Sequence, residues 1–450
     1  MEKPITDYDE IIKNCSCSYC GNNCDDITYL LKNGEIVGVR HACRIGASKI
    51  INDQDQRLLN PMMRNDDGIL EETTWDKALD ETAKLLYNSI RPVLYGWGET
   101  SVEAIKKGIK IAEKTGSVID NQSTICHGSS IQAFQNVGHP VMTLGEVKNR
   151  ADVIVYVGTN PMDDHPRHLS RYTTFPEGFF RRNGRQDRTI ITLDPKYTNT
   201  AKVSDDWIQF NMNEDYLLFN ALRMLLKGES LDEEVVAGVP IEKLEQLIET
   251  MKNAEYGALF FGLGVSQTLA KQKNVDVLIQ LVEDLNRYSK WSMLPMRGFF
   301  NVSGFNIALT SETGYPYGVD FSRGYPRFMV GETTTIDLLN RREPDFFMAV
   351  SADPGVQFPG YTIQHLVDIP TIQIDTHWGP FTELADIVLP STRVGVETAG
   401  TAYRMDSIPL FMKKVIDKPE NCHSDEWILT QIYKRLELLK QKEDEHGIHS

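Results

Sequence analysis

The sequence has no long apolar run. No stretch approaches the roughly 20 apolar residues that a membrane-spanning helix needs, and residues 1–10 are polar and acidic, which predicts no signal peptide. Basic residues are also too few for a nucleic-acid partner: 47 Lys and Arg stand against 63 Asp and Glu, a net charge of −16, whereas phosphate binding needs a basic surface. We therefore predict a cytoplasmic protein with no membrane span and no nucleic-acid partner.

Cysteine is scarce as well, but its placement is informative. The count of seven is odd and four fall within ten residues, which suits a metal site in a reducing compartment better than a disulfide framework. Cys17, Cys20, Cys24 and Cys43 could supply the four thiolates of a four-iron cluster. Tetrahedral zinc accepts a similar set, but zinc ribbons usually pair two C-x-x-C turns, whereas here one loop carries three cysteines. The spacing favours a cluster, and it is kept by Cys17 rather than by the neighbouring Cys15.

The rest of the chain alternates short apolar runs with helical patterns. Asn33-Gly34 between apolar runs predicts a β-hairpin over residues 27–39, and Thr74 predicts the start of a helix that ends near Ile90. Buried strands are predicted at 92–95, 153–157, 189–193, 258–261, 346–350 and 371–374, and helices at 214–227, 241–252, 273–288 and 425–442. This alternation indicates an α/β fold with mainly parallel sheets in two or three domains.

An internal repeat is visible at the ends of four of these strands. The members of the two copies are Gly158-Thr159-Asn160-Pro161, Asp194 and Asp205 in the first, and Ser351-Ala352-Asp353-Pro354, Asp375 and Asp386 in the second. A carboxylate at the carboxyl end of such a strand can accept hydrogen bonds from a ribose or a base. Each of these motifs alone is compatible with an ordinary turn between a strand and a helix. Because the motifs occur twice in the same order, they favour two related nucleotide sites.

Cys126-His127-Gly128 is the second candidate metal centre. A thiolate can bind a high-valent metal, the adjacent imidazole can exchange a proton near neutral pH, and Gly128 allows the backbone to approach a bulky cofactor. Taken alone, a buried cysteine that precedes a helix would be the more frequent explanation.

Three further positions carry weaker signals. Arg297 follows a predicted strand and precedes Gly298, so it could hold a small anion, although a surface ion pair is equally compatible. His165 and His168 are separated by a proline that breaks helical spacing, so we do not expect them to ligate a metal. Cys422 stands alone and is expected to be an inert buried thiol.

Together these residues resemble the molybdopterin-dinucleotide oxidoreductases, which include formate dehydrogenases and periplasmic nitrate reductases. Within that family the chain is most similar to the B subunits of formylmethanofuran dehydrogenases. The resemblance spans essentially the whole chain, and its tyrosine–proline runs are the most specific part. The motifs are Cys43-Arg44-Ile45-Gly46, Cys126-His127-Gly128, Met296-Arg297-Gly298, Gly314-Tyr315-Pro316-Tyr317, Arg323-Gly324-Tyr325-Pro326-Arg327, Ala352-Asp353-Pro354-Gly355 and Glu397-Thr398-Ala399-Gly400-Thr401.

The resemblance implies a domain organisation. A small iron–sulfur domain would occupy residues 1–58. One α/β pterin-dinucleotide domain would be discontinuous, at 59–120 and 305–450, and a second would occupy 121–304, the two being related by the internal repeat. The usual C-terminal β-barrel-like domain would be lacking.

The resemblance also implies roles for individual residues. Cys126 would ligate tungsten or molybdenum beside the pterin sulfurs, His127 would be the acid/base group and Arg297 would orient carbon dioxide or formate. The cluster ligands of the [4Fe–4S] centre would be Cys17, Cys20, Cys24 and Cys43. The two molybdopterin guanine dinucleotides would be contacted by Gly158, Thr159, Asn160, Asp194 and Gly264 on one side, and by Asp353, Asp375 and Thr376 on the other.

The implied function is the reduction of carbon dioxide to formate, which another subunit would use to make formylmethanofuran. The implied partners are a small β-domain subunit that completes the pterin site, an amidohydrolase-like zinc subunit and ferredoxin-like electron carriers. The alternatives are a stand-alone formate dehydrogenase and a non-catalytic electron-relay subunit.

Overall fold

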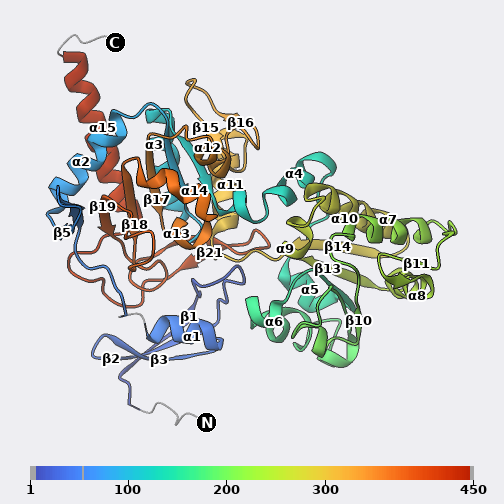
Figure 1. The fold of residues 1–450 in the computed structure, drawn as a ribbon. Helices are drawn as coiled ribbons and strands as arrows, with labels where there is room; N and C mark the ends of the chain where they lie inside the picture. Colours follow the sequence, from blue (N-terminus) through green and yellow to red (C-terminus); the bar gives the residue numbers. More distant parts are fainter. Residues whose placement is uncertain (1–6, 53–54, 446–450) are drawn as a thin grey trace.

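The computed structural model describes residues 7–52 and 55–445, and it has three parts (Figure 1). An N-terminal sheet lies below two α/β parts that stand side by side. No helix within the described ranges is long and apolar enough to cross a membrane. The prediction that residues 1–10 carry no signal peptide falls mostly on residues 1–6, which lie outside the described residues.

The N-terminal sheet is antiparallel, in the order β1 (Glu10–Cys15), β2 (Ile27–Lys32) and β3 (Glu35–Arg40). The predicted hairpin is confirmed: Asn33 and Gly34 both have positive φ values, 53° and 80°, which a type I′ turn requires. Helix α1 (Arg44–Ile51) follows, and its N-cap is Cys43, whose sulfur accepts a hydrogen bond from the amide of Gly46 at 3.2 Å. This geometry returns Cys43 towards the loop between β1 and β2.

The larger α/β part contains a nine-stranded sheet whose centre is parallel and whose edges are antiparallel. Its order is β16 (Arg327–Phe328), β15 (Val319–Asp320), β7 (Val118–Asn121), β6 (Pro92–Gly96), β17 (Phe346–Val350), β18 (Thr371–Asp375), β19 (Ile387–Pro390), β4 (Met62–Arg64) and β5 (Leu70–Glu72). Strands β7, β6, β17, β18 and β19 pair in parallel, as the alternating pattern predicts.

Helices cover both faces of this sheet because successive strand residues point in opposite directions. Leu94 and Met348 pack on one face against α2 (Trp75–Tyr87), α3 (Val102–Thr115), α11 (Val302–Thr313) and α15 (Asp425–Glu445). Val93 and Phe347 pack on the other against α12 (Thr335–Asn340) and the segment that contains α13 (Pro354–Gln357) and α14 (Gly360–Ile363). The hairpin of β20 (Gly400–Tyr403) and β21 (Pro409–Met412) lies outside the sheet.

The smaller α/β part contains a five-stranded, wholly parallel sheet. Its order is β10 (Asp206–Ile208), β9 (Thr189–Leu193), β8 (Val153–Val157), β13 (Tyr256–Phe261) and β14 (Lys290–Pro295). One face is covered by α4 (Gly128–Val137), α7 (Asp215–Leu226), α8 (Ile241–Lys252) and α10 (Gln272–Leu285), and the other by α5 (Leu144–Arg150) and a π-helical turn, Leu169–Thr173. Other short elements include α6 (Pro161–Asp164), α9 (Leu263–Ser266), β11 (Val235–Val236) and β12 (Val239–Pro240).

The central strand β6 offers a test of the core. Leu94 has no exposed surface, so Leu94→Ala should lower the free energy of unfolding by about 2–5 kcal/mol, through lost burial and the cavity left behind. Ile90, 87% exposed, is the matched position, and Ile90→Ala should change stability by less than about 0.5 kcal/mol. Urea denaturation followed by circular dichroism would measure both, and equal effects would contradict this packing.

Candidate functional site

The two sheets end in similar turns at their carboxyl edges. Gly158 follows β8 with φ +54°, and Ser351 follows β17 with φ +47°. The second acid of each copy of the internal repeat also makes the same kind of hydrogen bond. Asp205 accepts from the amide of Ile190 at 2.7 Å, and Asp386 accepts from the amide of Thr371 at 2.8 Å. In parallel α/β sheets, ligands bind outside the carboxyl ends of the strands.

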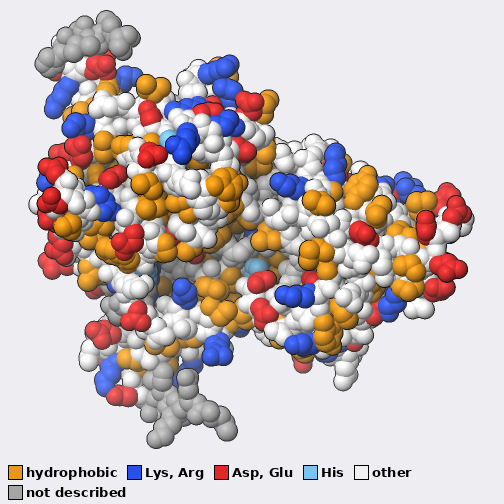
Figure 2. All heavy atoms as spheres, in the orientation of Figure 1, with side chains coloured by type: hydrophobic (Ala, Val, Ile, Leu, Met, Phe, Trp, Pro, Cys, Tyr) orange, Lys and Arg blue, Asp and Glu red, His pale blue; other side chains and the backbone are white. Residues whose placement is uncertain are grey.

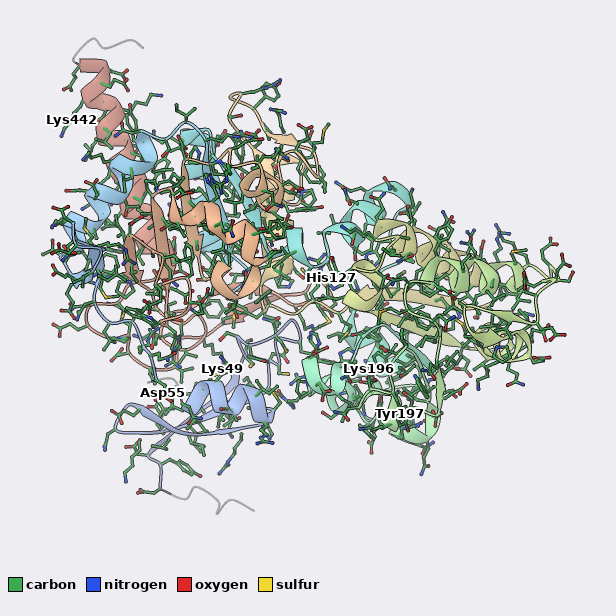
Figure 3. All side chains as sticks on the ribbon, in the orientation of Figure 1. Lys49, Asp55, His127, Lys196, Tyr197 and Lys442 are labelled. Carbon is green, nitrogen blue, oxygen red and sulfur yellow. The ribbon has the colours of Figure 1, made fainter. Side chains whose placement is uncertain are left out.

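A cavity of about 720 Å³ lies at the carboxyl edge of the five-stranded sheet, and we call it the Cys126 cavity. Its walls include both members of the Cys126-His127 pair and the turn after β8. The lining residues that matter below are Tyr19, Cys20, Glu99, Cys126, His127, Gly158, Thr159, Asn160, Asp194, Lys196, Gly262, Gly264 and Gly298. The surface is hollowed where the three parts of the molecule meet, and His127 lies between the two α/β parts (Figures 2 and 3).

At the turn after β8, the backbones of Gly158 and Gly264 pack against each other without side chains. An added Cβ at Gly158 would lie 2.8 Å from the backbone carbon of Gly264, and one at Gly264 would lie 2.8 Å from the carbonyl oxygen of Gly158. The two backbones therefore touch, and no side chain fills the wall of the Cys126 cavity at either position. Such a bare backbone edge lets a large ligand approach closely.

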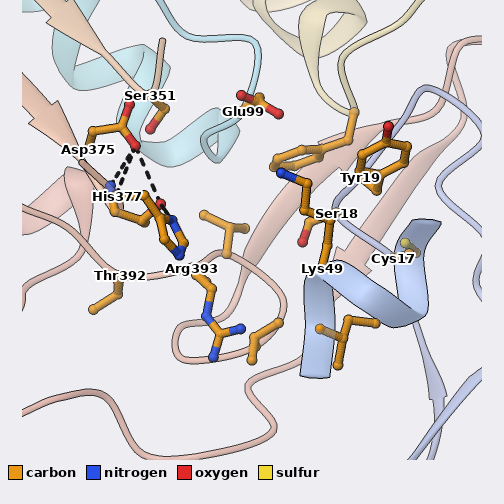
Figure 4. A pocket seen from close by; sticks show the side chains of 16 residues that line it. Cys17, Ser18, Tyr19, Lys49, Glu99, Ser351, Asp375, His377, Thr392 and Arg393 are labelled. Atoms are coloured by element: carbon orange, nitrogen blue, oxygen red, sulfur yellow. Dashed lines mark hydrogen bonds between the residues drawn. The ribbon is translucent and has the colours of Figure 1, made fainter. Parts of the chain in front are cut away.

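A second cavity of about 250 Å³, the Asp375 cavity, lies at the carboxyl edge of the nine-stranded sheet (Figure 4). It is lined by Cys17, Tyr19, Lys49, Glu99, Ser351, Asp375, Thr376, His377, Thr392 and Arg393, among others. The Asp375 carboxylate accepts from the amide of Thr376 at 2.6 Å, and its pKa is raised, first by burial.

The two cavities share two residues, Tyr19 and Glu99. Cysteines of the same loop reach both, Cys20 in the Cys126 cavity and Cys17 in the Asp375 cavity. Burial, followed by repulsion from Asp375, raises the pKa of Glu99 to about 7. The cysteine loop, residues 17–24, thus lies at the junction of two cavities that open from two different sheets.

The four predicted cluster ligands surround a small cavity of their own. It is lined by Cys17, Tyr19, Cys20, Asn22, Asn23, Cys24, Ile27, Cys43, Pro166 and Arg167. Burial raises the pKa of Cys17 and raises that of Cys20 to about 12, and neighbouring thiols add to both shifts. Cys15 is buried outside this set, so the structure places Cys17 on the cavity, as the spacing predicts.

A single metal ion would set its own requirement on the positions of these four thiols. Within residues 7–52 and 55–445, no three His, Cys, Asp or Glu side chains converge closely enough to hold one metal ion. A tetrahedral zinc ion needs all four sulfurs about 2.3 Å from one centre. A four-iron cluster needs four thiolates around one site, and the four cysteines line one cavity.

Cys126 and His127 are fixed at the start of α4. Burial raises the pKa of Cys126 to about 11, and the charge of Arg297 opposes this shift. His127 bonds to the Ser130 hydroxyl at 3.0 Å through Nδ1 and donates to the carbonyl of Met296 at 3.2 Å through Nε2. Burial and the positive charge of Arg297 lower the pKa of His127 to about 3. In this arrangement His127 is neutral and both ring nitrogens are engaged.

Arg297 faces a neighbouring space, which we call the Arg297 cavity. That cavity measures about 270 Å³ and is lined also by His139, Ser303, Asn306, Met405 and Asp406. Arg297 is 8% exposed, and its guanidinium donates to Asn306; in the described part of the chain no carboxylate pairs with it. Its charge still acts on Cys126. A buried cation without an acidic partner is suited to a small anion.

Two histidines that the sequence did not favour as metal ligands hold the cysteine loop through Asn22. The carbonyl of His165 accepts from the Asn22 side chain at 3.4 Å, and His168 bonds to the same side chain at 3.2 Å. His165 also donates through Nε2 to the carbonyl of Arg297 at 2.7 Å. Gly21 donates to the carbonyl of Gly298 at 2.9 Å. The loop is therefore locked onto the end of β14, next to the Cys126 cavity.

The structure brings most of the predicted residues together. Thr159, Asn160, Asp194 and Gly264 line the Cys126 cavity, and Asp375 and Thr376 line the Asp375 cavity. Asp353 differs: its carboxylate accepts from the amides of Gly355 and Phe381, at 2.8 and 3.1 Å, and it lines neither cavity. The sequence did not predict four other residues that line these cavities: Tyr19, Lys49, Glu99 and Lys196. The only signal was that Glu99 comes just after a predicted strand.

Cys422 is fully buried, as expected for an inert thiol, and its sulfur donates to the carbonyl of Leu58 at 3.4 Å.

Comparisons with known proteins agree with this geometry. Residues 57–314, more than half of the chain, match the molybdopterin oxidoreductase family. The chain is 48% identical to the B subunit of the tungsten-containing formylmethanofuran dehydrogenase 2 of Methanocaldococcus jannaschii, over 95% of this chain and 99% of that protein. It belongs to the molybdopterin oxidoreductases, among the formylmethanofuran dehydrogenase B subunits. It is therefore an oxidoreductase of this family, and the resemblance drawn from the sequence is confirmed.

A second relative supports the same assignment. The corresponding protein of Methanococcus maripaludis is 45% identical over 96% of this chain and 100% of its own length. Among solved structures, the formyltransferase/hydrolase complex FhcABCD of Methylorubrum extorquens, determined with methylofuran, contains a chain that superposes with a TM-score of 0.69 at 20% identity. The match covers 84% of this chain and 99% of that one, and it supports the mixed α/β fold with parallel sheets.

Proposed function

We propose that this chain is the catalytic subunit of a formylmethanofuran dehydrogenase and reduces carbon dioxide to formate. The formate would leave for another subunit, where formylmethanofuran is made. The observation that carries the proposal is the meeting of two cavities, one from each parallel sheet, beside Cys126 and the cysteine loop. The relatives named as B subunits of this enzyme, similar over their whole length, favour it over a stand-alone formate dehydrogenase.

We assign one pterin guanine dinucleotide to each of these two cavities. Each opens from the carboxyl ends of parallel strands, and each has a carboxylate, Asp194 or Asp375, placed to accept hydrogen bonds from a ribose or a base. The contact between Gly158 and Gly264 leaves a backbone edge without side chains on the wall of the Cys126 cavity. We keep Gly158, Thr159, Asn160, Asp194 and Gly264 as contacts of one dinucleotide, and Asp375 and Thr376 as contacts of the other. Asp353 would act indirectly, by fixing the turn after β17.

Cys17, Cys20, Cys24 and Cys43 would hold the [4Fe–4S] cluster. The four thiols surround one cavity, and burial raises the pKa of Cys17 and Cys20, so a cationic metal group would favour their thiolate forms. Because Cys17 and Cys20 each also line one of the larger cavities, the cluster would lie next to both dinucleotides.

When bound, the bis-pterin tungsten or molybdenum supplies the two-electron exchange between carbon dioxide and formate. Cys126 would be its protein ligand. Arg297 would hold the carboxylate of formate, because it is a buried cation with no acidic partner among the described residues. His127, which donates through Nε2 and accepts at Nδ1, would orient neighbouring groups and move a proton only if one of these bonds opened.

The three-part division of the chain is also part of this proposal. The iron–sulfur domain would be residues 1–58, and the sheets support two α/β domains at 59–120 with 305–450 and at 121–304. All nine strands of the large sheet begin in the first and all five of the small sheet lie in the second.

We further propose that the chain works in a cytoplasmic hetero-oligomer. The similarity to a chain of a multi-subunit complex supports this, as do relatives named as subunits. The partners we expect are a small β-domain subunit, an amidohydrolase-like zinc subunit and ferredoxin-like electron carriers.

Purification of the native complex tests the proposal. We expect tungsten or molybdenum together with iron, formate-dependent reduction of a viologen dye, and copurification of a zinc-containing hydrolase. A free and fully active chain would favour the stand-alone formate dehydrogenase. Iron without tungsten or molybdenum in an active complex would favour the electron-relay subunit.

A further inference from the structure

The segment 165–171 contributes charge to the wall around the four N-terminal cysteines. Arg167 lines the cavity between them, together with Pro166. Arg171 lies one helical turn further on, and both arginines face the acids that directly follow Cys24. The segment comes from the smaller α/β part, so these contacts join two parts of the molecule that are far apart in sequence.

Arg167 is held by a two-point contact. Its two terminal nitrogens donate to the two carboxylate oxygens of Asp26 at 2.5 and 2.6 Å, the parallel arrangement that gives arginine its geometric selectivity. Arg171 forms ion pairs with both Asp25 and Asp26. Burial alone would raise the pKa of Asp26, but these two guanidinium groups lower it below its usual range.

The two signs of charge are unequally exposed. The side chains of Arg167 and Arg171 are 20% and 19% exposed, whereas those of Asp25 and Asp26 are 37% and 38% exposed. Water therefore screens the acids more strongly than the arginines. Burial raises the pKa of Cys24, and Arg167 and then Arg171 are the charges that oppose this shift.

We propose that Arg167, fixed by Asp26, is a positioning residue that sets the reduction potential of the N-terminal cluster through Cys24. The inference rests on the proposed function, because it needs the four-iron cluster. Reduction of such a cluster adds one electron, without a proton, and so adds one negative charge. A partly buried cation beside one of the cluster thiolates favours the reduced state, because it stabilises the added negative charge. Arg167 would thus make the cluster easier to reduce by a one-electron carrier.

The test is a potentiometric titration of the purified holoenzyme with dithionite and mediators, followed by electron paramagnetic resonance of the reduced cluster. Arg167→Gln should shift the midpoint potential to more negative values. Asp26→Asn removes the negative charge of the partner of Arg167 in this ion pair, and it should shift the midpoint potential to more positive values. Opposite signs from two variants of one ion pair identify electrostatics, because a loss of structure would not reverse direction with the charge removed.

Two further variants complete the test. Arg167→Lys keeps the charge and should give a smaller shift than Arg167→Gln. Arg185→Gln is the matched control, since Arg185 pairs with Asp205 away from the cysteines, and it should leave the potential unchanged. An unchanged potential in both Arg167→Gln and Asp26→Asn, or shifts of the same sign, would overturn the inference while leaving the cluster intact. A wild-type holoenzyme without iron would instead overturn the proposed function.

Discussion

Cys126→Ala should abolish formate oxidation and carbon dioxide reduction while the protein remains folded and keeps its iron. Cys126 lines the Cys126 cavity together with Cys20, but it lies on a different element from the four proposed cluster ligands. Removing it takes away the proposed protein ligand of the metal but leaves the cluster ligands untouched. Formate-dependent viologen reduction would fall to background, and iron analysis would be unchanged.

Cys422→Ala is the matched control for this experiment. Cys422 is also a buried thiol, but its sulfur contacts Leu58 and lines none of the cavities described above. It should keep full turnover. Normal formate oxidation by Cys126→Ala, with wild-type tungsten or molybdenum content, would contradict the role of Cys126.

Arg297→Ala should keep the metal and the dinucleotides but lower turnover by about 1,000-fold. The guanidinium is a buried cation whose charge acts on both Cys126 and His127, and removing a buried group that stabilises developing negative charge costs on the order of 10²–10³ in rate. Steady-state rates with formate, together with metal analysis, measure the effect. Normal formate oxidation by this variant would show that Arg297 has another role.

Two substitutions separate charge from shape at this position. Arg297→Lys keeps a cation but loses the planar fork, so we expect it to restore only part of the rate. Arg323→Ala removes an exposed arginine in the same half of the chain and should leave turnover unchanged. Equal losses in Arg297→Ala and Arg323→Ala would indicate an effect of net charge alone.

The regular elements were predictable because their signals are local. Strand β8 was predicted and found at residues 153–157, and α8 at 241–252. The helix predicted over residues 273–288 ends at Leu285, because the last three residues form turns. Sheet order was not predictable, since β4 and β5 join the far edge of a sheet whose other strands lie later in the chain. That pairing depends on contacts between distant residues, which no local pattern records.

The site residues also divide into those that local sequence motifs predicted and those that only the folded structure reveals. Cysteine spacing and the turn after β8 are short motifs, and the structure places their side chains on cavities. Asp353 followed the same pattern, yet its oxygens are used by nearby amides, which only the folded turn reveals. Glu99 and Tyr19 were missed because their importance comes from where two cavities meet, not from their neighbours in sequence.

One small residue in the cysteine loop has a consequence for the rate of electron supply. At Gly21 an added Cβ would lie 2.3 Å from the carbonyl oxygen of Arg297, so only glycine lets the loop rest against the end of β14. Any larger residue would lift the proposed cluster away from the Cys126 cavity. Tunnelling falls off exponentially with separation, so Gly21→Ala would slow electron transfer from the proposed cluster without changing any of its ligands.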